Sequence, residues 1–205
     1  MRKIIGTVIV LVVVGVCGTA AFAYSGFYDV AATDPHWPIT YRLIETARVR
    51  SIKAHAAGIV APADLGDQAR VVAGTSHFAE HCSTCHSAPG VEANDMAEDM
   101  YPSPPLLTDV AHRYSPGELF WILKHGIKMS GMPSWGDHGD EDLWNTVAFM
   151  EKLPTMSEED YGKLVMASMA AGGHHMHGHH DMSGMSMEAE PPASAPAQAA
   201  GEQAR

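Results

Sequence analysis

The chain has 205 residues and a mass of 22.0 kDa, which is room for one ordinary domain with additional segments. Its 13 Lys and Arg against 24 Asp and Glu give a formal net charge of −11, which argues against a nucleic acid partner, because phosphate binding needs clustered positive charge. The three cysteines, Cys17, Cys82 and Cys85, exclude a disulfide-stapled scaffold, and 13 Met with 13 His indicate a metal or a cofactor.

The first predicted element is an apolar helix at the start of the chain. Arg2 and Lys3 precede an uncharged run over residues 4–23, and a helix of that length spans about 30 Å, enough to cross a bilayer. The run ends in small residues that also fit a signal peptide cut near Ala23. In both cases the remainder of the chain is exported. We expect residues 4–23 of segment 1–23 to be a membrane anchor that holds the protein on the periplasmic side of the bacterial inner membrane. The alternative is a soluble periplasmic protein after cleavage near Ala23.

Residues 24–66 are predicted to be a connector that contains one helix. Aromatic residues near its start suit a bilayer interface, and Pro35 and Pro38 interrupt the chain. Helical periodicity follows over residues 39–56, with a basic face.

The folded domain is expected over residues 67–156, and it contains the sequence Cys82-Ser83-Thr84-Cys85-His86. This has the form of an attachment site for c-type haem. Two thiols one helical turn apart can reach the two vinyl groups of the porphyrin, and the adjacent histidine is then aimed at the iron. A redox dithiol and half of a zinc site are the alternatives, but neither a βαβ context nor a second cysteine pair accompanies the motif.

Two amphipathic helices bracket this motif. Gly74, Phe78 and Cys82 recur every four residues and therefore share one face of the first helix. The last helix is expected over residues 140–153, where apolar side chains form a stripe that Pro154 ends. Taken alone, both stripes indicate ordinary core packing.

Between these helices the sequence predicts a proline-rich loop over residues 101–108, a helix and a second loop. Ser115 and Glu118 form a capping box for the helix, which ends near His125. The second loop carries Met129 and Met132 among glycines, and the proline after Met132 holds the chain extended so that one side chain is presented.

The tail, residues 157–205, is expected to be flexible, because from Met169 onward it has almost nothing to bury. It packs five His and four Met into 14 residues, a mixture that suits copper in both oxidation states. The candidate copper ligands are His174, His175, Met176, His177, His179, His180, Met182, Met185 and Met187.

With these residues in view, the sequence resembles the class I c-type cytochromes. That family packs a Gly-x-x-x-aromatic face of its first helix against an aromatic residue of its last helix, where this chain has Phe149. The resemblance implies an all-α, cytochrome c-like haem domain of three to five helices that binds one covalent haem c. It ends near Met156 and implies nothing about the tail.

The resemblance also implies roles for single residues. Pro105 and Leu107 are expected against the proximal side of the haem, with the Pro105 carbonyl accepting a hydrogen bond from His86 Nδ1, although Pro104 fits almost as well. Met132 is expected to be the distal iron ligand opposite His86. The rivals for the distal position are Met129, His112 and His125.

A haem with both axial positions filled has no open position for dioxygen or peroxide, so the sequence predicts an electron carrier rather than an enzyme. The expected partners are a redox protein that donates electrons and another that accepts them, and the carrier can also be a subunit of a larger oxidoreductase. The alternative hypothesis is a copper-handling protein, in which the haem domain reduces or senses copper bound by the tail.

Overall fold

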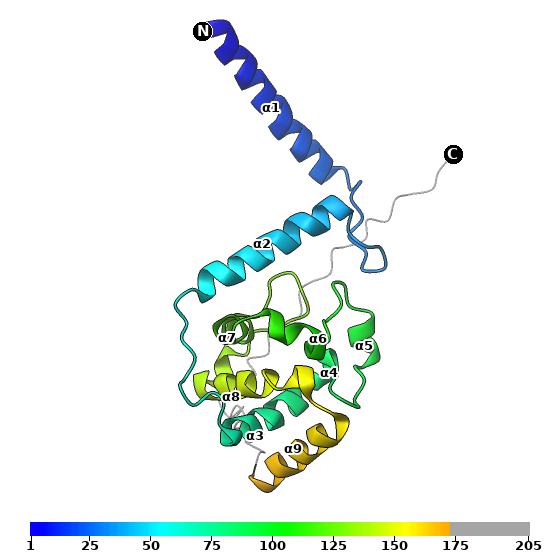
Figure 1. Cartoon of the computed structure of the whole chain (residues 1–205). Coiled ribbons are helices and arrows are strands. Elements are labelled where there is room, and N and C mark those ends of the chain that lie inside the picture. The colour runs from blue at the N-terminus through cyan, green and yellow to red at the C-terminus, as the bar shows by residue number, and fades with distance from the viewer. Residues whose placement is uncertain (173–205) are drawn as a thin grey trace, which may run out of the picture. The chain divides into compact units, whose positions relative to one another are not determined.

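The computed structural model describes residues 1–172, and within this range helices are joined by turns and loops and the only β pairing is an isolated bridge between Ala88 and Val91 (Figure 1). An all-α domain is therefore confirmed. The helical segments in chain order are α1 (Arg2–Tyr24), α2 (Pro38–Ala56), α3 (Gln68–His77), η1 (Phe78–Cys82), α4 (Ser83–His86), α5 (Asp95–Glu98), α6 (Leu107–Val110), η2 (Ala111–Arg113), α7 (Pro116–His125), η3 (Gly136–His138), α8 (Asp140–Met150), η4 (Leu153–Thr155) and α9 (Glu158–Ala170).

Helix α1 carries the apolar run at the start of the chain. It has 23 residues, its most apolar part has a mean hydropathy of 2.6, and none of its side chains is buried. It is long and apolar enough to cross a membrane, and a signal sequence has the same properties. The helix is thus an anchor or a signal peptide.

The centre of the fold is the crossing of α3 and α8 (Figure 1). Gly74 allows it, because a Cβ atom at this position would lie 1.9 Å from the backbone oxygen of Asn145 on α8. One turn further along, the rings of Phe78 and Phe149 meet with centroids 4.8 Å apart, and both side chains are fully buried. The shared face predicted from Gly74 and Phe78 therefore forms the closest helix contact in the domain core.

Helix α7 covers another side of α8. It begins with the predicted capping box, in which the Ser115 hydroxyl accepts from the backbone N–H of Glu118 and the Glu118 carboxylate accepts from the backbone N–H of Ser115. The Phe120 ring stacks on Trp144 of α8, with centroids 4.2 Å apart and planes 14° from parallel. Leu119 and Leu123 are buried beside this stack.

The segment over residues 24–66 was predicted to be a connector that contains one helix, and the structure has helix α2 there over Pro38–Ala56. Helix α2 begins at Pro38, since proline suits the first helical position, and it packs against α7. Ile52 and Ala56 are buried, and the backbone oxygen of Ile59 would lie 2.7 Å from a Cβ atom at Gly117. The α2 segment is therefore part of the folded unit.

The segment over residues 157–205 was predicted to be a flexible tail, and at its start the structure has helix α9 over Glu158–Ala170. Ser157 caps α9 by accepting from the backbone N–H of Asp160, and α9 packs against α3. Tyr161 and Ser168 are buried on the inner face. The last predicted helix is shorter than expected, since α8 ends at Met150 and the separate short turn η4 contains Pro154.

Candidate functional site

The cysteine pair lies on a continuous helical run formed by α3, η1 and α4. Its middle part, η1, is one π-helical turn, an irregularity that often marks functional sites. Cys82 is buried and Cys85 is partly exposed, and both are free thiols. The run ends at Ser87, whose φ of 60° turns the chain away.

Burial, together with a smaller effect of the neighbouring Cys85, raises the pKa of the Cys82 thiol to about 12. A redox dithiol needs the opposite, because its attacking sulfur must ionise near neutral pH. The environment of Cys82 therefore does not favour a thioredoxin-like role.

His86 is oriented by the loop that precedes α6. Its Nδ1 lies 2.8 Å from the carbonyl oxygen of Pro105, which can only accept, so Nδ1 carries the proton. The lone pair is then on Nε2, the arrangement typical of a histidine that ligates a metal. Burial lowers the pKa of His86 and so favours the neutral ring, and the hydrogen bond to Pro105 partly offsets this shift.

The loop over residues 101–108 lies beside the cysteine pair. Pro105 makes the bond to His86, whereas Pro104 lines a cavity of about 350 Å³ together with Cys85 and Leu106. Leu107 begins α6 and packs against the edge of the core. Of the two prolines considered from the sequence, Pro105 occupies the position beside the histidine.

The two loop methionines lie in different environments. Met132 is half-buried against the core cluster, whereas Met129 is 80% exposed and has a φ of 58°. Hydrogen bonds hold the Met132 backbone, with its carbonyl accepting from the N–H of Ile127 at 3.1 Å and its N–H donating to the Ser130 hydroxyl at 3.2 Å. The rival histidines His112 and His125 are exposed. The burial of Met132 thus favours it as the inward-facing donor of the loop.

Comparison with known families identifies this region. Residues 69–150, from α3 to the end of α8, match the family model described as cytochrome C oxidase, cbb3-type, subunit III. These residues form a c-type cytochrome domain. No curated protein and no solved structure matches the chain.

The residues of the cytochrome domain fit a covalently held haem. Two thiols on one helical turn can form the covalent links to such a group, and an imidazole with its lone pair on Nε2 and a half-buried thioether are ligand types that hold haem iron. The family match confirms the resemblance to c-type cytochromes and implies haem c as the cofactor.

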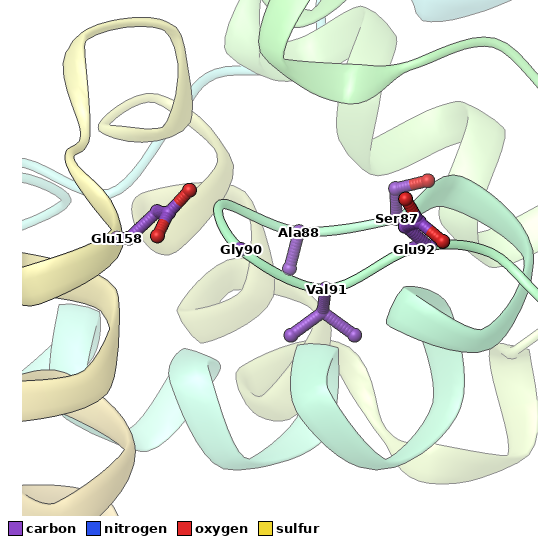
Figure 2. A pocket seen from close by; sticks show the side chains of 6 residues that line it. All are labelled: Ser87, Ala88, Gly90, Val91, Glu92 and Glu158. Atoms are coloured by element: carbon purple, nitrogen blue, oxygen red, sulfur yellow. The ribbon is translucent and has the colours of Figure 1, made fainter.

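A second hollow in the cytochrome domain, of about 770 Å³, lies over the turn that follows His86. Figure 2 shows this turn, with Glu158 of α9 on one side of Gly90 and the side chains of Ser87 and Glu92 at the other end. Two carboxylates and an exposed backbone turn do not suit an apolar macrocycle. This hollow is therefore not part of the candidate haem site.

The structure also assembles a group that sequence reasoning missed. His77 and His81 are four residues apart on the run that leads into the cysteine pair, and His138 ends η3. Each offers a ring nitrogen, and these nitrogens lie within 4.8 Å of one another. The spacing of the first two was a visible signal, but only the fold brings the third to them. The candidate copper ligands at positions 174–187 lie outside the described residues.

Proposed function

We propose that this protein is a single-haem electron carrier whose haem is bonded to Cys82 and Cys85. His86 is the proximal iron ligand and Met132 the distal one. The observation that carries the proposal is the hydrogen bond from His86 Nδ1 to the Pro105 carbonyl. With the proton on Nδ1, the lone pair on Nε2 is available to bind a metal, and this histidine lies next to two free thiols in the sequence. The match of residues 69–150 to a cytochrome family supports it.

Haem c, when bound, supplies a one-electron couple. The chain's own residues hold and shield that group. The Pro105 carbonyl fixes the orientation of the His86 ring, and the hydrogen bonds of the Met132 backbone fix the loop opposite. Leu107 and the buried part of the cysteine turn exclude water. With two protein ligands on the iron, the site accepts electrons rather than substrates.

The attachment chemistry is tested by full-length protein matured in cells with intact haem-attachment machinery. Pyridine haemochrome analysis should give one covalent haem per chain, and the variants Cys82→Ala and Cys85→Ala should each lose one thioether link. Cys17→Ala is the matched control and should leave the haem content unchanged, because Cys17 lies in α1. Wild-type protein without covalent haem would refute the proposal.

The electron carrier is further proposed to be anchored by α1 on the periplasmic side of the inner membrane. The positive residues Arg2 and Lys3 before the apolar helix support this orientation. The name of the matching family, a subunit of a cbb3-type oxidase, supports a fixed oxidoreductase partner. Affinity purification from detergent-solubilised membranes should recover a haem-containing partner, and recovery of the carrier alone after mild crosslinking would speak against a fixed complex.

A copper-handling protein is the second candidate, favoured by the His and Met content of residues 174–187. In this reading the tail binds copper and the haem domain reduces or senses it. Changing His174, His175, His177, His179 and His180 to serine in the full chain should lower the copper stoichiometry and the copper tolerance of cells. Equal stoichiometry in both proteins would remove this candidate.

A further inference from the structure

The cluster of His77, His81 and His138 lies outside the candidate haem ligands and is built by two separate segments of the cytochrome domain, the continuous run of α3 and η1 and the short turn η3. The ring centroids of His77 lie 4.8 Å from those of both His81 and His138, and His81 and His138 are 5.1 Å apart. All three side chains are partly buried. Trp135 borders the group, with its ring centroid 5.1 to 5.9 Å from each imidazole.

Local structure explains why the rings converge. His77 is the last residue of α3 and His81 lies in the π-helical turn η1, so a spacing of four residues places both on nearly the same side of the run. The η3 segment is fixed from the other side. The Trp135 N–H donates to the Leu123 carbonyl at 3.0 Å, and Lys124 of α7 pairs with Asp140 at 2.6 Å.

Thr146 holds the ring of His77 in place. Its hydroxyl lies 2.8 Å from the Asp142 carbonyl, to which it can donate its one proton, and 2.8 Å from His77 Nδ1. When the hydroxyl donates to the carbonyl, it accepts from His77 Nδ1, and the lone pair of His77 is on Nε2. Histidines that ligate metals typically donate their other N–H to such an acceptor.

The charge around the cluster also favours a cation. The Glu80 carboxylate lies 3.9 Å from His81 Nε2 and is half exposed. Packing alone would not require three nitrogen-bearing rings whose nitrogens lie within 4.8 Å of one another. Neutral imidazole is a preferred ligand of divalent Zn, Cu and Ni, and three histidines with one further position are a known zinc arrangement.

We propose that His77, His81 and His138 bind one divalent transition-metal ion of the Zn²⁺ and Cu²⁺ class. The site is distinct from the haem iron and from the tail. Tetrahedral ligation at about 2.0–2.1 Å places ligand nitrogens about 3.4 Å apart, so binding draws the three rings together from their present spacing. Because the ion would tie η3 to α3 and η1, it would rigidify the chain that follows Met132.

The test uses the full-length, oxidised holoprotein in which the five tail histidines are changed to serine, so that the tail does not compete. Equilibrium dialysis against Zn²⁺ should show one bound equivalent. His81→Ala and His138→Ala in this background should each weaken binding at least tenfold, while His112→Ala, an exposed histidine outside the cluster, should leave it unchanged. Thr146→Val removes the acceptor of His77 and should weaken binding about 10- to 100-fold.

Cu²⁺ provides an independent readout in the same protein. The electron paramagnetic resonance spectrum should show nitrogen hyperfine coupling from imidazole ligands, and the signal should change in His138→Ala. Should an alanine variant fail to fold, His81→Gln keeps the test available, since this side chain is 28% exposed. Unaltered Zn²⁺ affinity and an unaltered Cu²⁺ spectrum in the cluster variants would overturn the proposal, whether or not haem is attached as proposed.

Discussion

The candidate iron ligands His86 and Met132 are each held in place by hydrogen bonds that involve backbone atoms. The Pro105 carbonyl fixes the proton of His86 on Nδ1, and the hydrogen bonds to Ile127 and Ser130 fix the Met132 backbone. Met129, the second methionine of this loop, takes part in none of these hydrogen bonds, and its side chain is 80% exposed. The two methionines therefore differ clearly in burial, and the difference favours Met132 as the candidate ligand.

Replacing Met132 by alanine should give a high-spin haem in the full-length protein, because a methyl group cannot reach the iron. The visible spectrum of the oxidised and reduced protein measures this change. Met129→Ala is the matched control and should leave the spectrum as in the wild type. A spectrum unchanged in Met132→Ala but altered in Met129→Ala would transfer the distal role to Met129.

The helix elements meet at contacts that leave no room for additional atoms. At the crossing of α3 and α8, a Cβ atom on residue 74 would overlap backbone atoms of Asn145, which cannot move aside as a flexible side chain would. The Phe78 and Phe149 rings lie next to this point. The position of the cysteine turn relative to α8 therefore depends on a glycine.

Gly74→Ala should lower the free energy of unfolding by about 3 kcal/mol, because the two helices must separate. Thermal or denaturant unfolding of the holoprotein measures it. Gly162→Ala in α9 is the control: no atom lies within 4 Å of its Cβ position, so helix propensity should raise stability by about 0.5–1 kcal/mol. Equal effects of the two substitutions would contradict the packing account.

Helix α9 supplies a second test at this scale. Tyr161 is 6% exposed and contacts Phe149, with ring centroids 6.1 Å apart. Tyr161→Ala should therefore lower the free energy of unfolding by about 3 kcal/mol, as large-to-small core substitutions do. Lys163→Ala, on the exposed side, should change it by less than about 0.5 kcal/mol. An undisturbed unfolding curve for Tyr161→Ala would show that α9 contributes no packing.

The sequence predicted those parts of the site whose signal is local. Each of these signals spans only a few residues of sequence. They are the cysteine turn, the capping box of α7 and the pair of methionines in one loop. Helix α9 was not predicted, because the polar composition of the residues that follow it was taken as typical of the whole segment. Ser157, a common N-cap residue, followed by three acidic residues was a local signal for its start. The histidine cluster depends on tertiary packing of η3, which no local pattern specifies.

At the scale of the whole molecule, α1 is either a membrane anchor or a signal peptide, and we propose that it is the anchor. The uncharged, unburied run over residues 4–23 and the positive residues Arg2 and Lys3 at the start of α1 fit a membrane span, and a signal sequence has the same features. The folded unit then begins with α2, whose Ile52 is buried. An electron carrier tethered in this way would meet its partners along the membrane surface.

Intact mass analysis of protein purified from membranes should show a chain that retains residues 1–23, because we propose that α1 stays as the anchor. The carrier should remain in the membrane fraction after a high-salt wash, since apolar insertion is not screened by salt. A mature N-terminus at Tyr24 and recovery in the soluble fraction would instead assign residues 1–23 to a cleaved signal.

The closed coordination of the iron is the claim on which the electron-carrier account depends. Carbon monoxide added to the reduced, full-length holoprotein at neutral pH measures it directly. We predict no spectral change, because His86 and Met132, as proposed, would leave the iron no open position. Rapid formation of a carbon monoxide complex in the wild-type protein would show an open position and contradict the account.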